Sequence, residues 1–121
     1  MALVLIVDDS PTEVHLLRQY LEKAGFETDS AQDGSECLTK ARARHPDVVL
    51  MDIVMPGMNG YQATRELARD PETASIPVVM VTTKGNETDR VWGMRQGAID
   101  YLVKPVTEEQ LVTKVKAALS A

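Results

Sequence analysis

Residues 48–52 read Val-Val-Leu-Met-Asp, a short apolar run that ends in a carboxylate. A nearly continuous run of branched and aliphatic residues predicts a strand that is covered on both faces, as in parallel sheets. Similar runs recur at Leu3–Val7, Thr28–Ala31 (weakly), Val78–Val81 and Tyr101–Val103. The sequence therefore predicts five strands, of which the quoted run is the third.

Segments with helical spacing lie between and after these strands. Ser10 and Pro11 suit the N-cap and the first position of the first helix, and Gly25 suits its end. Residues 107–110, Thr-Glu-Glu-Gln, form a capping box for the last helix. The apolar positions that place the five helices are Val14, Leu17, Leu21 and Ala24; Cys37, Leu38 and Ala41; Ala63 and Leu67; Val91 and Met94; and Leu111, Val112, Val115 and Leu119.

Strand and helix thus alternate five times along the chain. This alternation predicts the α/β class, with right-handed βαβ crossovers and a doubly wound parallel sheet that carries helices on both faces. The length suits a single domain, and no repeat, linker or low-complexity segment interrupts the pattern. We therefore expect one domain over residues 1–121.

Composition excludes several classes of protein. Hydrophobic residues make up 44% of the chain and charged residues 26%, as in ordinary globular proteins. The one cysteine, Cys37, lies on an apolar helix face and is expected to be an inert core residue. The apolar runs are far shorter than the ~20 residues of a membrane span, and no signal-peptide pattern is present, which favours a cytoplasmic protein without membrane insertion. The net charge of −5 argues against nucleic acid as a partner.

Polar residues stand where the predicted strands end. Asp8 and Asp9 follow the first strand, Asp52 follows the third, Thr82 ends the fourth, and Lys104 follows the fifth. In open parallel sheets, ligands bind outside the carboxyl ends of the strands, near the switch in strand order. We therefore expect three carboxylates, a hydroxyl and an ammonium group to meet at one rim.

This combination of groups points to phosphoryl chemistry. Three clustered carboxylates repel one another unless a cation lies among them, and an all-oxygen ligand set suits Mg²⁺. With that repulsion screened, the Asp52 carboxylate could attack phosphorus in line and form an acyl phosphate. Lys104 and the Thr82 hydroxyl would offset the charge on the phosphoryl oxygens.

Five motifs stand in order along the chain: residues 5–10 (Leu-Ile-Val-Asp-Asp-Ser), 47–56 (Asp-Val-Val-Leu-Met-Asp-Ile-Val-Met-Pro), Gly60, 81–82 (Val-Thr) and 101–105 (Tyr-Leu-Val-Lys-Pro). Together they resemble the receiver domains of two-component response regulators, over essentially the whole length. The resemblance is to the single-domain, CheY-like type. It implies a flavodoxin-like (βα)5 fold with strand order 2-1-3-4-5 and no output domain.

A narrower resemblance comes from residues 81–84 (Val-Thr-Thr-Lys), 87–89 (Glu-Thr-Asp), 91–93 (Val-Trp-Gly) and 95–98 (Arg-Gln-Gly-Ala). These stretches are similar to the regulators of twitching-motility chemosensory systems. The resemblance implies a chemotaxis or type IV pilus pathway.

The family resemblance also implies roles for the residues around the metal. Asp52 matches the phosphoacceptor. Asp9 matches the residue that holds Mg²⁺ directly, and Asp8 the one that holds it largely through water. The backbone carbonyl of Val54 matches the third protein ligand of the metal, beside Asp9 and Asp52.

Further roles concern the phosphoryl group and the signal. Thr82 and Lys104 match the residues that contact the phosphoryl group, and Tyr101 matches the aromatic residue that switches with Thr82. The Lys104–Pro105 peptide bond is expected to be cis, a form that proline makes accessible.

The same resemblance implies the partners of the chain. A histidine kinase would be the phosphodonor, and a downstream protein would bind to the face of the fourth helix, fifth strand and fifth helix. Arg90, Met94 and Lys114 are the candidate contacts there. We expect a monomer that catalyses only its own phosphoryl transfer and dephosphorylation.

Three other functions compete with a phosphorylation switch. A haloacid-dehalogenase-type phosphohydrolase also uses a strand-end aspartate and Mg²⁺, but it needs a second aspartate where this chain has Val54. A flavin binder must cradle a phosphate, which Asp8 and Asp9 would repel. A phosphate sink would share the chemistry of the switch, and the sequence does not separate the two.

Two expectations concern residues near these motifs. Gly57 and Gly60 are expected to permit the turn after Pro56 and the start of the third helix. Trp92, in the predicted fourth helix, is expected to serve in packing first and in partner contact second.

Overall fold

The computed structural model describes residues 1–120; Ala121, the last residue of the expected domain, lies outside them. Five strands alternate with five helices, as the sequence predicts. The strands are β1 (Leu3–Val7), β2 (Glu27–Ala31), β3 (Val48–Met51), β4 (Val78–Thr82) and β5 (Asp100–Val103). The helices are α1 (Pro11–Lys23), α2 (Gly34–Arg44), α3 (Gly60–Arg69), α4 (Glu87–Gln96) and α5 (Glu108–Ser120). Among residues 1–120, no helix has the length and apolar character needed to cross a membrane.

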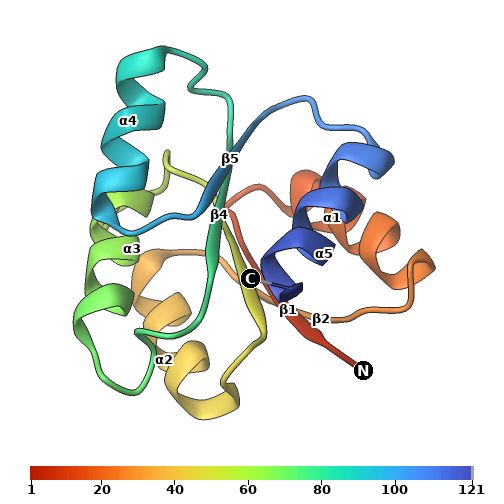
Figure 1. Ribbon diagram of the computed structural model, residues 1–121, viewed down its shortest axis with the longest axis horizontal. Coiled ribbons are helices and arrows are strands. Elements are labelled where there is room, and N and C mark those ends of the chain that lie inside the picture. Colours follow the sequence, from red (N-terminus) through yellow and green to blue (C-terminus); the bar gives the residue numbers. More distant parts are fainter. Residues whose placement is uncertain (121) are drawn as a thin grey trace.

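The strands form one parallel sheet in the order β2-β1-β3-β4-β5, which confirms the predicted fold class. Helices α1 and α5 cover one face, and α2, α3 and α4 cover the other (Figure 1). The chain steps from β1 outward to β2 and then returns to the other side of β1 for β3. This reversal of direction makes the crevice between the carboxyl ends of β1 and β3 the expected ligand site.

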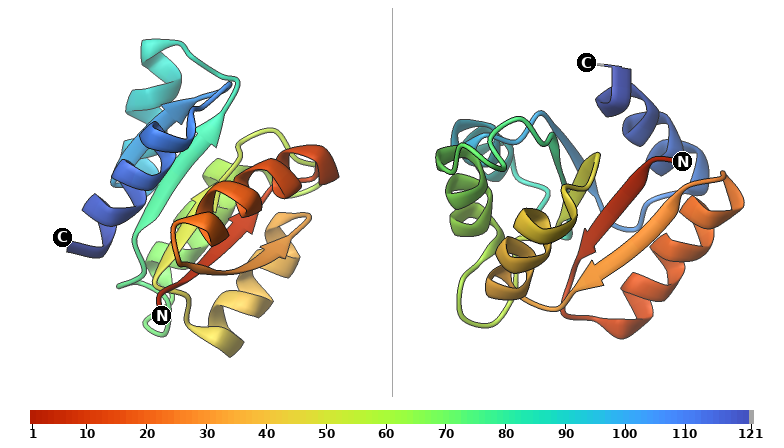
Figure 2. Two further views of the ribbon diagram at one scale, coloured as in Figure 1. Left: turned by 90° about the vertical axis from the view of Figure 1, so that its right-hand side faces the viewer. Right: turned by 90° about the horizontal axis from the view of Figure 1, so that it is seen from below.

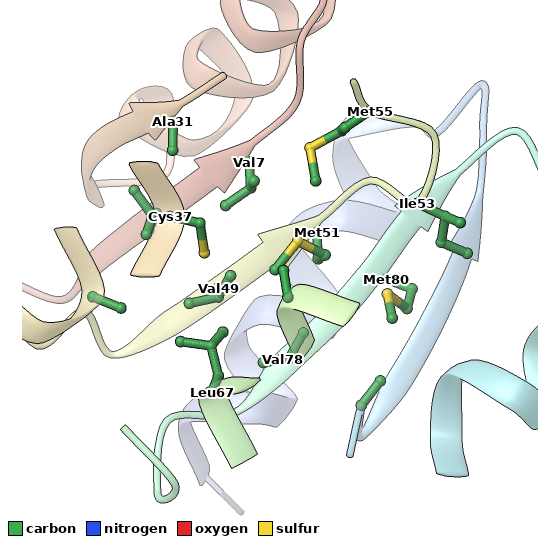
Figure 3. Close-up of a cluster of buried hydrophobic side chains, with 14 of the residues drawn as sticks. Val7, Ala31, Cys37, Val49, Met51, Ile53, Met55, Leu67, Val78 and Met80 are labelled. Atoms are coloured by element: carbon green, nitrogen blue, oxygen red, sulfur yellow. The ribbon is translucent and has the colours of Figure 1, made fainter. Parts of the chain in front are cut away.

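The two faces of the sheet bury separate apolar clusters. Along β1, Val4 and Ile6 pack under α1 and α5, whereas Leu5 and Val7 join the cluster under α2 and α3. Figure 3 shows this second cluster, with Cys37 and Met51 among its buried side chains. A strand with both faces buried needs apolar residues at every position, which explains the uninterrupted apolar runs of β1 and β3.

The predicted helix starts are confirmed at both ends of the chain. The Ser10 hydroxyl accepts a hydrogen bond from the Glu13 N–H at 3.4 Å, and Pro11 is the first residue of α1. In the capping box of α5, the Thr107 N–H donates to the Gln110 side-chain oxygen at 3.0 Å, and the Gln110 N–H donates to the Thr107 hydroxyl at 3.1 Å. Ala24, predicted as part of the first helix, is instead the residue that caps its end.

Helix α4 differs from the prediction. Val91 and Met94 were expected on its buried face and Trp92 in packing, but these side chains are 43%, 38% and 48% exposed. Of the residues of α4, only Gly93 is buried. The helix lies so close to β5 that a Cβ on Gly93 would be 3.4 Å from the Tyr101 ring. The helix therefore packs through its backbone and leaves its apolar side chains outside.

Candidate functional site

The predicted polar residues meet at the carboxyl end of the sheet, toward which all the strand arrows point (Figure 2). Asp8 and Asp9 follow β1, Asp52 follows β3, and Lys104 follows β5. Each of the three aspartates offers a carboxylate oxygen, and these oxygens all lie within 4.8 Å of one another. The fold thus brings together an acidic group from residues more than forty positions apart.

Lys104 places a positive charge inside this acidic group. Its side chain is only 8% exposed, and its ammonium Nζ lies 2.6 Å from Asp8 Oδ2 and 3.4 Å from Asp52 Oδ2. The Glu13 carboxylate approaches the same ammonium group at 3.9 Å. Burial disfavours the charged form, but the hydrogen bond to Asp8 and the nearby carboxylates outweigh it, so the pKa of Lys104 is raised. Lys104 is therefore a permanent cation at neutral pH.

The Asp52 carboxylate is held in one orientation by its surroundings. The side chain is buried, and its Oδ1 accepts a hydrogen bond from the Ile53 N–H at 2.7 Å. The Asp52 N–H in turn donates to the carbonyl of Val7 on β1 at 2.9 Å. Oδ2 is left facing Lys104. A carboxylate oxygen that is fixed in place and paired with a cation is suited to attack an electrophile.

Asp8 and Asp9 sit in different surroundings. Asp8 is buried, its Oδ1 accepts from the Ser10 N–H at 2.9 Å, and its Oδ2 accepts from Lys104. Asp9 is exposed. Both oxygens of Asp8 thus already have partners within the protein, whereas Asp9 faces solvent at the mouth of the site.

Gly60 is part of the support of Asp52, for a reason that the sequence did not reveal. Its N–H donates to the carbonyl of Ile53 at 2.9 Å. A Cβ at Gly60 would lie 2.7 Å from the Ile53 Cα and would also collide with the carbonyl oxygen of Asp52. Gly57, whose φ is +69°, lies in the turn after Pro56, and Gly60 begins α3, as predicted. What the prediction lacked is the close approach of two backbones at Gly60.

Thr82 and Tyr101 meet through the backbone of a third residue, Lys84. The Thr82 side chain is fully buried, and its Oγ1 accepts from the Lys84 N–H at 3.4 Å. The Tyr101 hydroxyl donates to the Lys84 carbonyl at 2.6 Å. Burial, together with the charges of Asp89 and Asp52, raises the pKa of Tyr101 to about 12. The sequence motif included Lys84, but sequence reasoning missed these contacts because backbone atoms make them, which no residue type signals.

Two further residues predicted for the site, Pro105 and Val54, directly follow Lys104 and lie two positions beyond Asp52, respectively. The Lys104–Pro105 peptide bond is cis, and the Lys104 N–H donates to the carbonyl of Thr82 at 2.8 Å. Val54 lies two residues beyond Asp52, with a side chain that is 55% exposed. A groove lined by Asp8, Asp9 and neighbouring residues of α1 opens beside the carboxylates.

Comparison with known proteins identifies the family that this fold and site define. Residues 4–116 match the family model described as the response regulator receiver domain, so the chain belongs to that family. It is 58% identical over 120 residues to the protein PilH of Pseudomonas aeruginosa, with 99% of each chain covered. It is 39% identical to the phosphate regulon transcriptional regulatory protein PhoB of Rhizobium meliloti, of which it spans about half (51%). The crystal structure of the chemotaxis protein CheY4 of Vibrio cholerae superposes with a TM-score of 0.93 at 34% identity, covering 98% of this chain and 99% of that one.

The chain is therefore a signalling protein of the two-component class. The resemblance drawn from the sequence motifs is confirmed, and the narrower resemblance agrees with the match to PilH. Because the chain belongs to this family, the family match decides against the phosphohydrolase and flavin-binding alternatives.

Proposed function

We propose that this chain accepts a phosphoryl group from a histidine kinase on Asp52 and transmits the signal by binding another protein. The observation that carries the proposal is the Asp52 carboxylate itself. It is buried, fixed by the Ile53 N–H at 2.7 Å, and 3.4 Å from the Lys104 ammonium, with the oxygens of Asp8 and Asp9 close by.

In the proposed reaction, a carboxylate oxygen of Asp52 attacks phosphorus as the bond from phosphorus to the kinase histidine breaks. Phosphorus gains a bond to the Asp52 oxygen, which makes an acyl phosphate, and the histidine nitrogen leaves with the electron pair of the broken bond. The phosphoryl oxygens keep their negative charge. Lys104 is the cation available to them, and the Thr82 hydroxyl is the donor on the adjacent strand. The same site would return the phosphoryl group to water, so the chain catalyses only its own phosphorylation and dephosphorylation.

The acidic cluster fits Mg²⁺, because its donors are carboxylate oxygens of the kind that this ion prefers. Asp9, which faces solvent, and Asp52 would be direct ligands, together with the Val54 carbonyl. Asp8, whose Oδ2 is paired with Lys104 at 2.6 Å, would act largely through water, as the family resemblance implies. When bound, Mg²⁺ supplies positive charge that offsets both the carboxylates and the incoming phosphoryl oxygens.

Removal of the Asp9 carboxylate is expected to abolish most of the stabilisation by Mg²⁺. An ion that binds only the folded state raises the free energy of unfolding by RT ln(1 + [L]/Kd), about 2.7 kcal/mol at one hundred times Kd. Without Mg²⁺, Asp9→Ala should be slightly more stable than the wild type because it removes like-charge repulsion. Thermal melts with and without Mg²⁺ measure both effects. An Asp9→Ala variant with an unchanged Mg²⁺-dependent shift would contradict the ligand assignment.

The signal is proposed to leave through Thr82, Tyr101 and the face of α4, β5 and α5. Movement of the Thr82 hydroxyl toward a new phosphoryl group would alter its contact with Lys84, to which Tyr101 is also bonded. Arg90, Met94 and Lys114 are candidate contacts for the target, and Lys114 is already paired with Asp100 at 3.0 Å. The exposed apolar residues of α4 favour target binding over a role as a phosphate sink.

The same proposal includes the signalling pathway, the cellular location and the oligomeric state of the chain. The match to PilH and the stretch from residue 81 to residue 98 support a role in a chemotaxis or type IV pilus pathway of twitching motility. We place the chain in the cytoplasm, where histidine kinases expose their phosphodonor, and expect it to act as a monomer.

The test combines phosphorylation with capture of the target. A small phosphodonor and Mg²⁺ should add one phosphoryl group, and hydroxylamine should remove it, as an acyl phosphate requires. Immobilised chain with beryllofluoride and Mg²⁺ should then retain a target from the lysate of its source that chain without beryllofluoride does not retain. A phosphoryl group that hydroxylamine does not remove would contradict phosphorylation of an aspartate. Capture of the same proteins with and without beryllofluoride would contradict a phosphorylation-dependent target.

A further inference from the structure

Helix α4 buries little of its own surface against the rest of the protein. Gly93 is its one buried residue, and the N-cap residue Asn86 makes no side-chain capping bond. Its larger apolar side chains face outward. A helix that buries so little apolar surface gains little from packing, so its position depends on specific contacts.

One such contact joins α4 to the neighbouring helix α3. Tyr61 is the second residue of α3, and its ring packs against the apolar cluster under α2 and α3. Its hydroxyl lies 3.1 Å from Asp89 Oδ1 and 3.3 Å from the Asp89 carbonyl, both in the first turn of α4. Among residues 1–120, these are the only side-chain hydrogen bonds between α4 and another element.

The environment of Tyr61 keeps its hydroxyl a donor. Burial and the hydrogen bond to Asp89 raise the pKa of Tyr61 to about 12, so the hydroxyl stays protonated at physiological pH. A hydrogen bond to a carboxylate is stronger than one between neutral groups, so it matters for a helix with one buried residue.

The position of α4 is in turn coupled to Tyr101. The Tyr101 ring lies beneath Gly93, at 3.4 Å from where a Cβ would be, so ring and helix occupy adjoining space. The Tyr101 hydroxyl binds the carbonyl of Lys84, in the short connection that leads from β4 into α4. A shift of the first turn of α4 would therefore disturb both the ring and its hydrogen bond.

We propose that Tyr61 is a positioning residue that latches the first turn of α4 to α3 and so favours the arrangement in which Tyr101 is buried. The inference rests on the proposed function, in which Thr82 moves toward the phosphoryl group. That movement would vacate space that the buried Tyr101 ring can fill, so phosphorylation of Asp52 would favour the same arrangement. Two influences that favour one state must reinforce each other, because coupling between sites is reciprocal. The latch therefore strengthens binding of a phosphoryl group at a site to which Tyr61 itself does not belong.

The variant Tyr61→Phe removes the hydroxyl and keeps the ring in the core. Amide hydrogen exchange followed by NMR should show about a tenfold loss of protection in α4, with β1 and β3 unchanged. The Kd for beryllofluoride in saturating Mg²⁺ should rise several-fold. Tyr20→Phe is the matched control: Tyr20 is also partly buried, but its hydroxyl makes no hydrogen bond within residues 1–120, so neither quantity should change.

A second pair of variants tests the acceptor. Asp89→Asn keeps a side-chain oxygen for the Tyr61 hydroxyl and should retain most of the protection of α4. Asp89→Ala leaves only the backbone carbonyl as acceptor, so its loss of protection should lie between those of Asp89→Asn and Tyr61→Phe. Unchanged exchange in Tyr61→Phe would overturn the latch. Faster exchange with unchanged beryllofluoride affinity would overturn the coupling to the site. Failure of the wild type to bind beryllofluoride would instead contradict the proposed function, while the exchange measurement would still decide whether the latch exists.

Discussion

Asp52→Asn is expected to gain no phosphoryl group under conditions that fully label the wild type. The amide has nearly the same shape, and its oxygen can still accept the Ile53 N–H. It carries no negative charge, however, and its nitrogen and oxygen are too weakly nucleophilic to form an acyl phosphate. The loss of labelling should be complete, because each of the other carboxylates near Lys104 lies in a different position from the fixed Asp52 oxygen. Intact-protein mass spectrometry after reaction with a small phosphodonor and Mg²⁺ measures the result.

The matched control is Asp33→Asn. Asp33 caps α2 by accepting the Glu36 N–H at 2.8 Å, and asparagine caps helices about as well as aspartate. This variant loses the same charge away from the site and should be labelled like the wild type. Labelling of Asp52→Asn to the same extent, with the group mapped to another residue, would show that the phosphoacceptor is misassigned.

Gly60→Ala is expected to destabilise the protein strongly, although alanine usually stabilises a helix relative to glycine. The new Cβ would lie 2.7 Å from the Ile53 Cα, and backbone cannot move aside as a flexible side chain can. Overpacking of this kind costs about 3 kcal/mol, or roughly 10 °C in Tm for a domain of this size. Phosphorylation should also slow, because relief of the clash displaces the Asp52 backbone.

Gly93→Ala provides the comparison. A Cβ there would meet the Tyr101 ring and Met80 at 3.4–3.6 Å, which is ordinary van der Waals contact. The gain in helix propensity, about 1 kcal/mol, should then raise Tm. Opposite signs for the two glycine substitutions in thermal melts would support the close-approach explanation. Equal stabilisation at both positions would refute it.

Much of the fold followed from local patterns in the sequence. The apolar runs Leu3–Val7 and Val48–Met51 required strands with both faces covered, and the alternation with helices left a parallel doubly wound sheet as the consistent architecture. Because parallel strands end at the same edge, the residues that follow them were bound to meet. The convergence of Asp8, Asp52 and Lys104 could therefore be predicted without coordinates, although the roles assigned to them remain proposals.

Helix α4 marks the limit of that reasoning. Periodicity reports which side of a helix is apolar, and for most helices that side faces the core. In α4 the side of the helix that carries Gly93 faces Tyr101, and Val91, Trp92 and Met94 are exposed. The sequence contained these residues, but only the packing of α4 against β5 decided which way they point.

Contacts made by backbone atoms, or across long sequence separations, also depended on the tertiary structure. The chemically distinctive residues of the site stand at the ends of predicted parallel strands, and these positions placed them at one rim of the sheet: Asp8, Asp9, Asp52, Thr82 and Lys104. The collision that forbids a side chain at Gly60 and the meeting of Thr82 and Tyr101 at Lys84 have no such signal. Both depend on ångström-scale distances to backbone atoms, and these distances are fixed only when the whole sheet and its helices are assembled.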